Sequence, residues 1–470
     1  MKKYLAILIG LLMILGVFSG CNGTKQNDSS VPSDPVTLTV VGPWEDCAAV
    51  EVIASEFKKS YPNCTINYEY LQNFDEGVAK RLENNDSIDL FLSNGVDDLT
   101  QYLVDFKTVG GIDLSDTFDG LIENATTTDD AGVKTLYQIP LGAEMRGLYV
   151  NTTLLDKYNI SVPTKQAELL AACATLKENG YIAMNGNPGT FGQQLLYPWI
   201  SNIISNADNY EEAYAKVVAR GAGLSEMFRE PFEFLYTLVE NGYYEYKTVE
   251  KYGCIIGNTD ESDGLFTDAS DEAVARNFFN IKASGDEYAF EEGTGEVAFL
   301  VGALSQKSTY DKVKSDYHST VEYVFIPAPV GEDGGFVYLS PAKAIAANKN
   351  SANVEWSIRF LNFLFTPENN EIFTEAFNAI PNTQNAFSYI SELYSVPSNH
   401  ISQVGQVSNF GYNFYKTMAS ALTDTSKANN PKYMVVDENG TYTNSDGEKC
   451  SMQTLGYYMD ALEASLVSAE

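Results

Sequence analysis

Residues 36–95 read VTLTVVGPWEDCAAVEVIASEFKKSYPNCTINYEYLQNFDEGVAKRLENNDSIDLFLSNG, and two kinds of segment alternate along them. Between short apolar runs, apolar residues recur at helical spacing, as at Val50, Ile53, Ala54 and Phe57. Strand, helix, strand, helix, strand within this length predicts βαβ units, a parallel sheet and the α/β fold class. The strands are expected at 37–41, 66–70 and 88–92, and the second helix at 75–84.

The rest of the chain continues this alternation. We expect Asp46 to cap the first helix. A second block opens near Thr135 with a strand, a loop, a strand at 147–150 and two helices. Further on we expect a largely helical region at 200–290, strands at 321–326 and 342–347, a helix at 352–365, and a helical tail after Gln384 with a hairpin at 434–442 turning at Asn439-Gly440.

Composition limits the function. The chain has 470 residues, 44% of them hydrophobic, which is globular and long enough for two lobes. Its net charge of −33 disfavours nucleic acid and anionic lipid as partners, because both are bound through clustered Lys and Arg. Only two histidines are present, which disfavours His-based hydrolases and zinc enzymes. Carboxylate-only chemistry, as in glycosidases, remains open.

Cysteine usage argues against a disulfide scaffold or a zinc site, so we expect no metal and no cofactor. Apart from Cys21, the cysteines are odd in number and widely spaced, with no CxxC pair. We expect most of them to be small buried residues, with the first two near opposite ends of the first helix. The cysteines concerned are Cys47, Cys64, Cys173, Cys254 and Cys450.

The N-terminus has the layout of a secretory signal. Lys2 and Lys3 precede an uncharged apolar run from Leu5 to Phe18, and Ser19-Gly20 supplies small residues before Cys21. The end of this segment resembles a lipobox, although Phe18 stands where Leu is usual. The resemblance implies a signal peptide at 1–20, lipidation of Cys21 and a polar linker over 21–35. An ordinary secretory signal with an incidental Cys is the alternative.

The chain resembles the extracellular solute-binding lipoproteins of carbohydrate ATP-binding-cassette importers. The most specific segment is LYQIPLGAEMRGLYVNTTLLDKYNISVPTKQAELLAACATLKENGY at 136–181. The others, in matching order, are LTVVGPWED, FKKSYPNCTINYEY, SIDLFLSNG, FEEGTGEVAFLVGA, FIPAP and AIAANKNSANVEWSIRFLNFLFTPENNEIFTEAFNAIPN. Where that family often has Gly followed closely by Trp, this chain has Gly302-Ala303-Leu304-Ser305, which removes one expected stacking platform.

The resemblance implies two α/β lobes that close on a ligand by hinge motion. Lobe one would comprise 36–143 and 337–378, and lobe two 147–334 and 382–470. The hinge crossings would fall near 143–146, 335–337 and 379–382.

Ligand-binding candidates follow from the expected strand ends, where open α/β sheets bind their ligands. Trp44 is the first, because sugars present C–H faces that stack on aromatic rings; capping of the lobe core is its alternative. Glu45 would accept hydrogen bonds from hydroxyls. Asn94 and Asp97 are cleft ligands or only a turn and a helix cap.

Three further positions come from the crossings and lobe two. Glu144 and Arg146 are two apart on an extended segment and point to one side, where they bind a ligand or pair with each other. Arg146 also suggests an acidic sugar. Trp199 suits stacking and core packing equally, and Tyr338 would contribute from a crossing strand.

These observations predict a lipid-anchored, monomeric, non-enzymatic receptor on the extracellular face of the cell membrane. It would pass a carbohydrate, expected to be an oligosaccharide, to permease subunits. A non-sugar solute such as a polyamine or peptide is the first alternative, since Glu45, Asp46 and Asp97 would suit a cation. A surface glycoside hydrolase and a structural surface protein are further alternatives.

Overall fold

A computed structural model describes the chain between residues 34 and 463 with gaps. The described residues are 34–44, 47–84, 86, 88–93, 97–117, 119–128, 132–186, 191–219, 221–244, 271–284, 287–383, 388, 390–391, 394–403, 441–443, 449–451, 459 and 463. Contacts divide the chain into two units, Met1–Val36 and Thr37–Glu470. All described residues from 37 onward belong to the second unit; the expected signal peptide, Cys21 and the hairpin residues 434–440 lie outside the described residues.

A five-stranded sheet forms the first α/β lobe, in the order β2-β1-β3-β15-β6. β1 pairs with β3 in parallel, Val40 opposite Leu90, which confirms for these two strands the parallel pairing predicted from the βαβ pattern. β15 runs antiparallel to both β3 and β6. The strands are β1 (Val36–Gly42), β2 (Cys64–Tyr70), β3 (Leu90–Ser93), β6 (Ile139–Pro140) and β15 (Ala344–Ala347).

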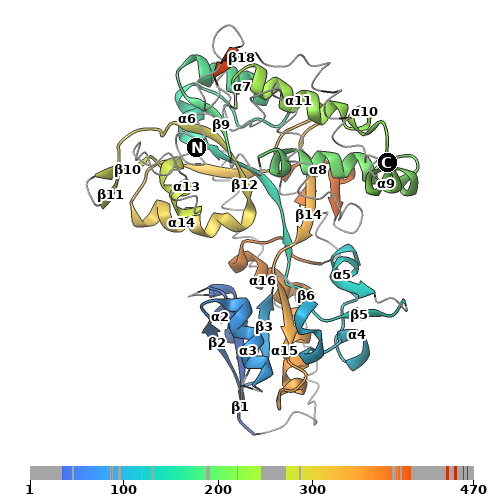
Figure 1. Cartoon of the computed structure of the whole chain (residues 1–470). Coiled ribbons are helices and arrows are strands. Elements are labelled where there is room, and N and C mark those ends of the chain that lie inside the picture. The colour runs from blue at the N-terminus through green and yellow to red at the C-terminus, as the bar shows by residue number, and fades with distance from the viewer. Residues whose placement is uncertain are drawn as a thin grey trace, which may run out of the picture. The chain divides into compact units, whose positions relative to one another are not determined.

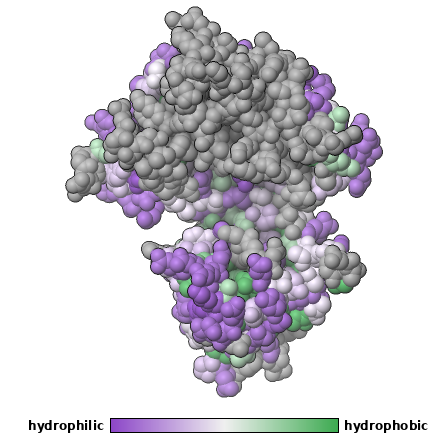
Figure 2. All heavy atoms as spheres, viewed as in Figure 1, coloured by the Kyte–Doolittle hydropathy of each residue, from purple (hydrophilic) through white to green (hydrophobic). Residues whose placement is uncertain are grey.

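Amphipathic helices pack on this sheet (Figure 1). They are α2 (Ala48–Ser60), α3 (Phe74–Glu83), α15 (Val354–Leu364) and α16 (Pro367–Phe377). α2 buries Val50, Ile53 and Phe57 as predicted. The ring of Phe57 meets that of Phe360 at 5.3 Å, which joins α2 to α15. Figure 2 shows mostly hydrophilic residues on the visible surface of this lobe, as expected of helices whose apolar faces are turned inward.

The start of α2 differs from the prediction. Cys47, and not Asp46, occupies the N-cap position, and no side chain caps the helix there. Asp46 itself lies outside the described residues. Cys64 opens β2 and does not end the helix. Cys47, Cys64 and Cys173 are free and buried, which confirms the expectation for these three cysteines.

A four-stranded sheet forms the second lobe, in the order β13-β8-β12-β9. Its strands are β8 (Arg146–Asn151), β9 (Ile182–Asn185), β12 (Val297–Ala303) and β13 (Tyr323–Ile326). β8 is antiparallel to both of its neighbours, whereas β9 is parallel to β12. The helices α7 (Gln166–Glu178) and α8 (Phe191–Ser205) pack against this sheet, and Trp199 and Tyr149 lie in the shared core.

The region expected to be largely helical is more varied. It contains α9 (Tyr210–Val218), α10 (Leu224–Met227), α11 (Arg229–Glu240) and α13 (Asp271–Phe278). A hairpin of β10 (Ile281–Ser284) and β11 (Glu287–Phe290) then replaces the predicted helix end. Asn280, with a positive φ of 57°, turns the chain at that point, so a local backbone signal overrode the surrounding helical composition.

A third sheet gathers the three segments expected as hinge crossings. β7 (Ala143–Glu144) pairs with the end of β14 (Val337–Pro341), Ser340 opposite Glu144. Ala143 also forms a bridge with Ile380, whose N–H donates to the Ala143 carbonyl at 2.8 Å. A Cβ on Gly142 would lie 2.8 Å from the Ile380 carbonyl oxygen, so this close approach requires glycine. The other edge of β14 pairs in parallel with β16 (Ile401–Gln403), where a helical tail was expected.

The remaining described elements are η1 (Asp97–Tyr102), α4 (Phe106–Val109), α5 (Asp119–Ala125), β4 (Thr126–Thr128), β5 (Lys134–Leu136), α6 (Thr152–Lys157), η2 (Leu304–Gln306), α14 (Lys307–Asp316), η3 (Ser398–His400), β17 (Thr441–Thr443) and β18 (Lys449–Ser451). β17 and β18 form a hairpin in the tail. Within the described residues, no helix combines the length and apolar character needed to cross a membrane.

Candidate functional site

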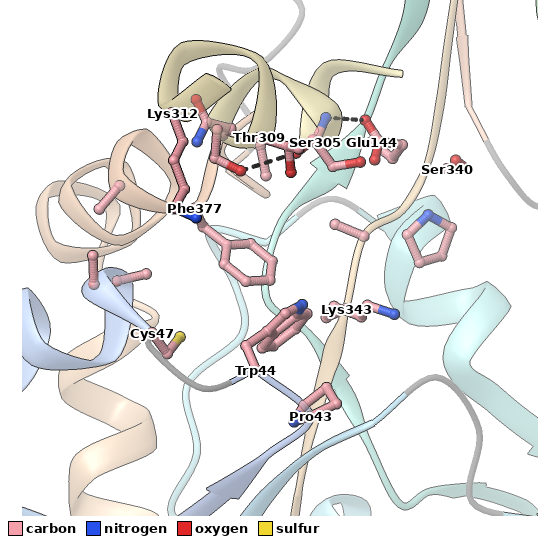
Figure 3. Close-up of a pocket in the computed structure, with 18 of the residues that line it drawn as sticks. Pro43, Trp44, Cys47, Glu144, Ser305, Thr309, Lys312, Ser340, Lys343 and Phe377 are labelled. Carbon is pink, nitrogen blue, oxygen red and sulfur yellow. Dashed lines mark hydrogen bonds between the residues drawn. The ribbon is translucent and has the colours of Figure 1, made fainter. Parts of the chain in front are cut away.

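A pocket of about 1020 Å³ lies where the three crossing segments meet both lobes (Figure 3). The first lobe contributes the loop after β1, the start of α2, Tyr70 and the end of α16; the second contributes η2 and α14. Its described lining is Pro43, Trp44, Cys47, Ala48, Ala49, Tyr70, Glu144, Arg146, Ser305, Ser308, Thr309, Lys312, Ser340, Pro341, Ala342, Lys343, Ala376, Phe377, Asn378 and Ala379.

Trp44 supplies an aromatic surface in this pocket. Its ring is partly exposed and meets the ring of Phe377 edge to face, with centroids 5.6 Å apart. Lys343 Nζ lies 5.7 Å from the indole centroid. Tyr70, 43% exposed, is a further aromatic residue of the lining. Aromatic rings that retain solvent access in a concave site suit the C–H faces of a sugar or another flat ligand.

A hydrogen bond from the side chain of Tyr68 positions the backbone of Trp44. The Tyr68 hydroxyl donates to the Trp44 carbonyl at 2.9 Å and lies 3.4 Å from the Trp44 amide nitrogen. Tyr68 reaches this position because Gly42 has no side chain; a Cβ there would lie 2.7 Å from the tyrosine ring. The Gly42-Pro43 pair that ends β1 therefore also positions the aromatic surface.

Glu144 lies on the crossing strand β7, opposite Ser340 of β14. Its Oε1 accepts from the Met145 N–H at 3.0 Å and from the Ser305 N–H at 3.2 Å. Burial raises the pKa of the Glu144 carboxyl, and the hydrogen bonds from Ser305 and Met145 and the nearby Arg146 charge offset part of that rise. Among the described residues Glu144 forms no ion pair, so the pairing with Arg146 considered above is absent.

Basic side chains surround the same space. Arg146 begins β8, and its buried Nε has no hydrogen-bond partner. Burial lowers the pKa of Lys343, while the Asp75 and Glu144 charges act in the opposite direction. Lys312 reaches the pocket from α14 and remains largely exposed. Each would give charged donors to a ligand oxygen.

Hydroxyl groups line the side formed by the second lobe. Ser305, Ser308 and Thr309 lie on η2 and the first turn of α14. The Gln306 side chain accepts from the Ala303 N–H at 2.9 Å and so fixes the turn into this segment. These serines and the threonine occupy the region where a tryptophan was expected from the resemblance.

Two predicted residues lie away from the pocket lining. Trp199 is 4% exposed and stacked on Phe336 at 5.5 Å, the packing of a core residue. Tyr338 is 2% exposed, and its hydroxyl accepts from the Tyr197 hydroxyl at 3.4 Å. Burial raises the pKa of Tyr338. Glu45, Asn94 and the side chain of Asp97 lie outside the described residues.

The described residues contain no group of three or more His, Cys, Asp or Glu side chains that would hold a metal ion. The described lining of the pocket offers aromatic faces, hydroxyl groups and charged groups to a ligand. Its described lining has a single carboxylate, Glu144, whereas glycosidases use a pair.

A family model described as bacterial extracellular solute-binding protein matches residues 45–371, more than half of the chain. The chain belongs to this family. The match spans the second sheet, every strand of the first sheet except β1, and most of the pocket lining. A comparison with curated protein sequences finds no match.

Solved structures agree on the fold of this solute-binding protein. A probable secreted solute-binding lipoprotein from Streptomyces coelicolor is 16% identical, with a TM-score of 0.54 over 92% of this chain and 99% of that one. The GacH receptor of Streptomyces glaucescens, solved unliganded and with acarbose, is 16% identical, with a TM-score of 0.51 over 82% and 91%. RafE in complex with raffinose is 12% identical, with a TM-score of 0.50 over 81% and 93%.

Several lining residues of this solute-binding protein escaped sequence reasoning. Tyr70 was assigned only to the alternation of a strand, and Phe377 stood only within a segment quoted for the family resemblance; both line the pocket. Both are the last residue of their element, β2 and α16. An aromatic residue at the end of a strand or helix, next to a predicted hinge crossing, is the signal that would have found them. Ser308 and Thr309 carried no such signal.

Proposed function

We propose that this protein is a lipid-anchored receptor that captures an oligosaccharide and delivers it to a permease in the membrane. The observation that carries the proposal is the pairing of Trp44 and Phe377 beside a row of hydroxyl and charged groups in one pocket. Sugars are bound by this combination, because they present both apolar C–H faces and many hydroxyls. The family and the titles of two similar structures, with acarbose and with raffinose, support the same ligand class.

Binding would proceed by closure of the two lobes about the crossings. We keep the proposed lobe bounds of 36–143 with 337–378 and 147–334 with 382–470. Ligand favours the closed state by as much as its affinity for the two states differs. Trp44 would stack on a sugar ring, and Glu144 and Arg146 would hold its polar groups from a crossing strand. No covalent step is part of the proposal, and the receptor would act as a monomer.

A melting-temperature screen tests the ligand class. The purified protein is heated with mono- and oligosaccharides, acidic sugars and polyamines in turn. Ligand at about 100 times its dissociation constant stabilises the folded state by ~2.7 kcal/mol, which raises the melting temperature of a chain this long by at least about a degree. Incubation of each hit, followed by chromatography, then checks for cleavage. A flat response to every sugar, or cleavage of one, would contradict the proposal.

The anchor has its own experiment. Cys21 would carry the lipid, and the polar residues 22–35 would tether the lobes at the extracellular face of the cell membrane. Cells that express the wild-type chain and Cys21→Ser are labelled with palmitate, and membrane and medium fractions are compared. Labelled protein in the membrane for the wild type, and unlabelled protein in the medium or retained as precursor for Cys21→Ser, is the expected result. Equal labelling would exclude Cys21 as the site.

A further inference from the structure

The pocket reverses the charge balance of the chain. The whole sequence has 63 acidic residues against 30 Lys and Arg. Among the described lining residues, by contrast, three are basic (Arg146, Lys312 and Lys343) and one is acidic (Glu144), although Lys312 also pairs with Asp316 of its own helix at 3.9 Å. The basic groups would attract an anionic ligand to this pocket, although the protein as a whole repels anions. The low-dielectric walls of a pocket strengthen such an electrostatic attraction.

Arg146 has an unused donor at this place. Its Nε is buried and has no hydrogen-bond partner, although buried polar groups are as a rule hydrogen-bonded. The unmade bond carries a desolvation cost that a ligand acceptor would remove. The guanidinium fork matches a carboxylate, which takes two parallel hydrogen bonds from it. Arg146 is therefore built for an anionic group better than for a neutral hydroxyl.

Lys343 brings a second cation to the aromatic surface. Its Nζ is 5.7 Å from the centroid of the Trp44 ring, so the ammonium lies beside the face on which a sugar would stack. Burial lowers the pKa of Lys343, and an anion bound nearby would favour its charged form, as the Asp75 and Glu144 charges do. The aromatic ring and the cation together fit a sugar ring that bears a carboxylate.

Glu144 offsets only part of this positive charge, because it is one carboxylate beside three basic residues. Its Oε1 is engaged by the N–H groups of Met145 and Ser305. Burial also raises the pKa of Glu144, which means that its charged form is disfavoured in the folded protein. In the described part of the pocket, no other acidic side chain is present.

We propose that the captured oligosaccharide is acidic: it carries uronic acid carboxylates that are bound by Arg146 and Lys343 while a sugar ring stacks on Trp44. This inference rests on the proposed function and narrows its ligand class. The three basic groups of the lining also disfavour a polyamine as the ligand, because they would repel a polycation.

The test compares acids with their own esters. Calorimetry measures the affinity of the purified protein for uronic acid trimers of several linkages, for the methyl ester of each, and for the corresponding neutral trimers. The ester keeps the sugar ring and removes the charge, with one added methyl group. We expect at least one acid to bind ten-fold or more tightly than its ester, a difference of about 1.4 kcal/mol. That affinity should fall as salt rises from 50 to 500 mM.

Variants assign the preference to residues. Arg146→Gln and Lys343→Gln should each weaken binding of the acid more than binding of the ester, so that the ratio of acid to ester affinity falls toward one. Lys134→Gln is the matched control, because Lys134 is an exposed lysine on β5 outside the pocket lining. Circular dichroism reports whether each variant is folded, and the comparison of acid with ester in the wild type needs no variant.

Each outcome decides a different point. Equal affinity for acid and ester, or binding of neutral sugars alone, would overturn the acidic ligand and leave the sugar receptor intact. A preference for the acid that both variants retain would overturn the role of Arg146 and Lys343. Absence of binding by every saccharide would contradict the proposed function itself, and binding of a polyamine alone would contradict both proposals.

Discussion

The indole of Trp44 meets the ring of Phe377 edge to face, with centroids 5.6 Å apart and ring planes at 81°. One residue follows the first strand of the chain and the other ends α16, so distant parts of the sequence build one aromatic corner. Phe377 orients the indole without covering it, since Trp44 remains partly exposed in the pocket. This geometry leaves a ring face available for a ligand.

Replacement of Trp44 is expected to weaken sugar binding. Trp44→Ala removes a stacking contact of ~1 kcal/mol or more, which lowers affinity at least several-fold. The fold should remain, because Trp44 is a partly exposed loop residue. Calorimetry with the ligand identified by the melting screen is the measurement. Trp356→Phe, at a buried position of α15 outside the pocket, is the control and should keep its affinity. Unchanged affinity in Trp44→Ala would remove that residue from the site.

Gly42→Ala is expected to act on the site through Tyr68. The new Cβ would lie 2.7 and 2.8 Å from two ring carbons of Tyr68, so the tyrosine must shift and its hydrogen bond to the Trp44 carbonyl is lost. Overpacking of this kind costs ~1–3 kcal/mol. We expect a lower melting temperature together with weaker ligand binding.

A double-mutant cycle separates this clash from other effects of the glycine change. Gly42→Ala is repeated in a Tyr68→Ala background, where the space is free. The cost to stability should then shrink by most of its value, since the two positions are in contact. Equal costs in both backgrounds would show that Tyr68 is not the group displaced.

The pH dependence of stability should report the buried Glu144. Because burial raises the pKa of Glu144 in the folded state, its protonated form is favoured by folding. The contribution to stability is therefore present at low pH and is lost as pH rises through the raised pKa. Glu144→Gln should melt at or above the wild-type temperature at pH 8, with the gap closing toward pH 4.

Thermal unfolding of both proteins between pH 4 and pH 8 is the measurement. Glu355→Gln is the control, because Glu355 is an exposed residue in the first turn of α15. A gap that widens as the pH falls would have the wrong sign for a carboxyl with a raised pKa.

Thiol reactivity should be low at the three described cysteines. Burial raises the pKa of Cys47 and Cys173, and it raises the pKa of Cys64 to about 11. Since the thiolate is the reacting form, maleimide at pH 8 should label each at less than about a tenth of the rate in the unfolded chain. Peptide mass spectrometry follows each site separately.

Bound ligand should slow the labelling of Cys47 further, because Cys47 lines the pocket, and should leave Cys64 and Cys173 largely unaffected. Equal protection at all three positions would indicate general stabilisation and not occupancy of this pocket.

The spacing of apolar residues along the sequence was sufficient to predict the first βαβ unit of the first lobe. The apolar spacing of Val50, Ile53 and Phe57 matches the buried face of α2, and the predicted parallel pairing is present between β1 and β3. The hairpin at β10 and β11 was missed because a turn at Asn280, set by one residue with positive φ, carries little weight against a long helical composition.

The site was predicted only where single residues stood out. Trp44, Glu144 and Arg146 were identified from loops and crossings, and all three line one pocket. Trp199 could not be assigned, because helical spacing does not say which face of α8 meets Phe336. Phe377 and Ser308 approach Trp44 and Glu144 only through the tertiary fold, which no local spacing encodes.

The strand order of the first sheet also bears on how the chain is made. β15, at Ala344–Ala347, lies between β3 and β6 and pairs with both. A nascent chain that has been synthesised only as far as Pro140 contains β3 and β6 but lacks β15, the strand that pairs with both of them. Contacts so distant in sequence form late and slowly. A chain synthesised from its N-terminus thus remains incompletely folded until most of it exists, a delay compatible with export before folding.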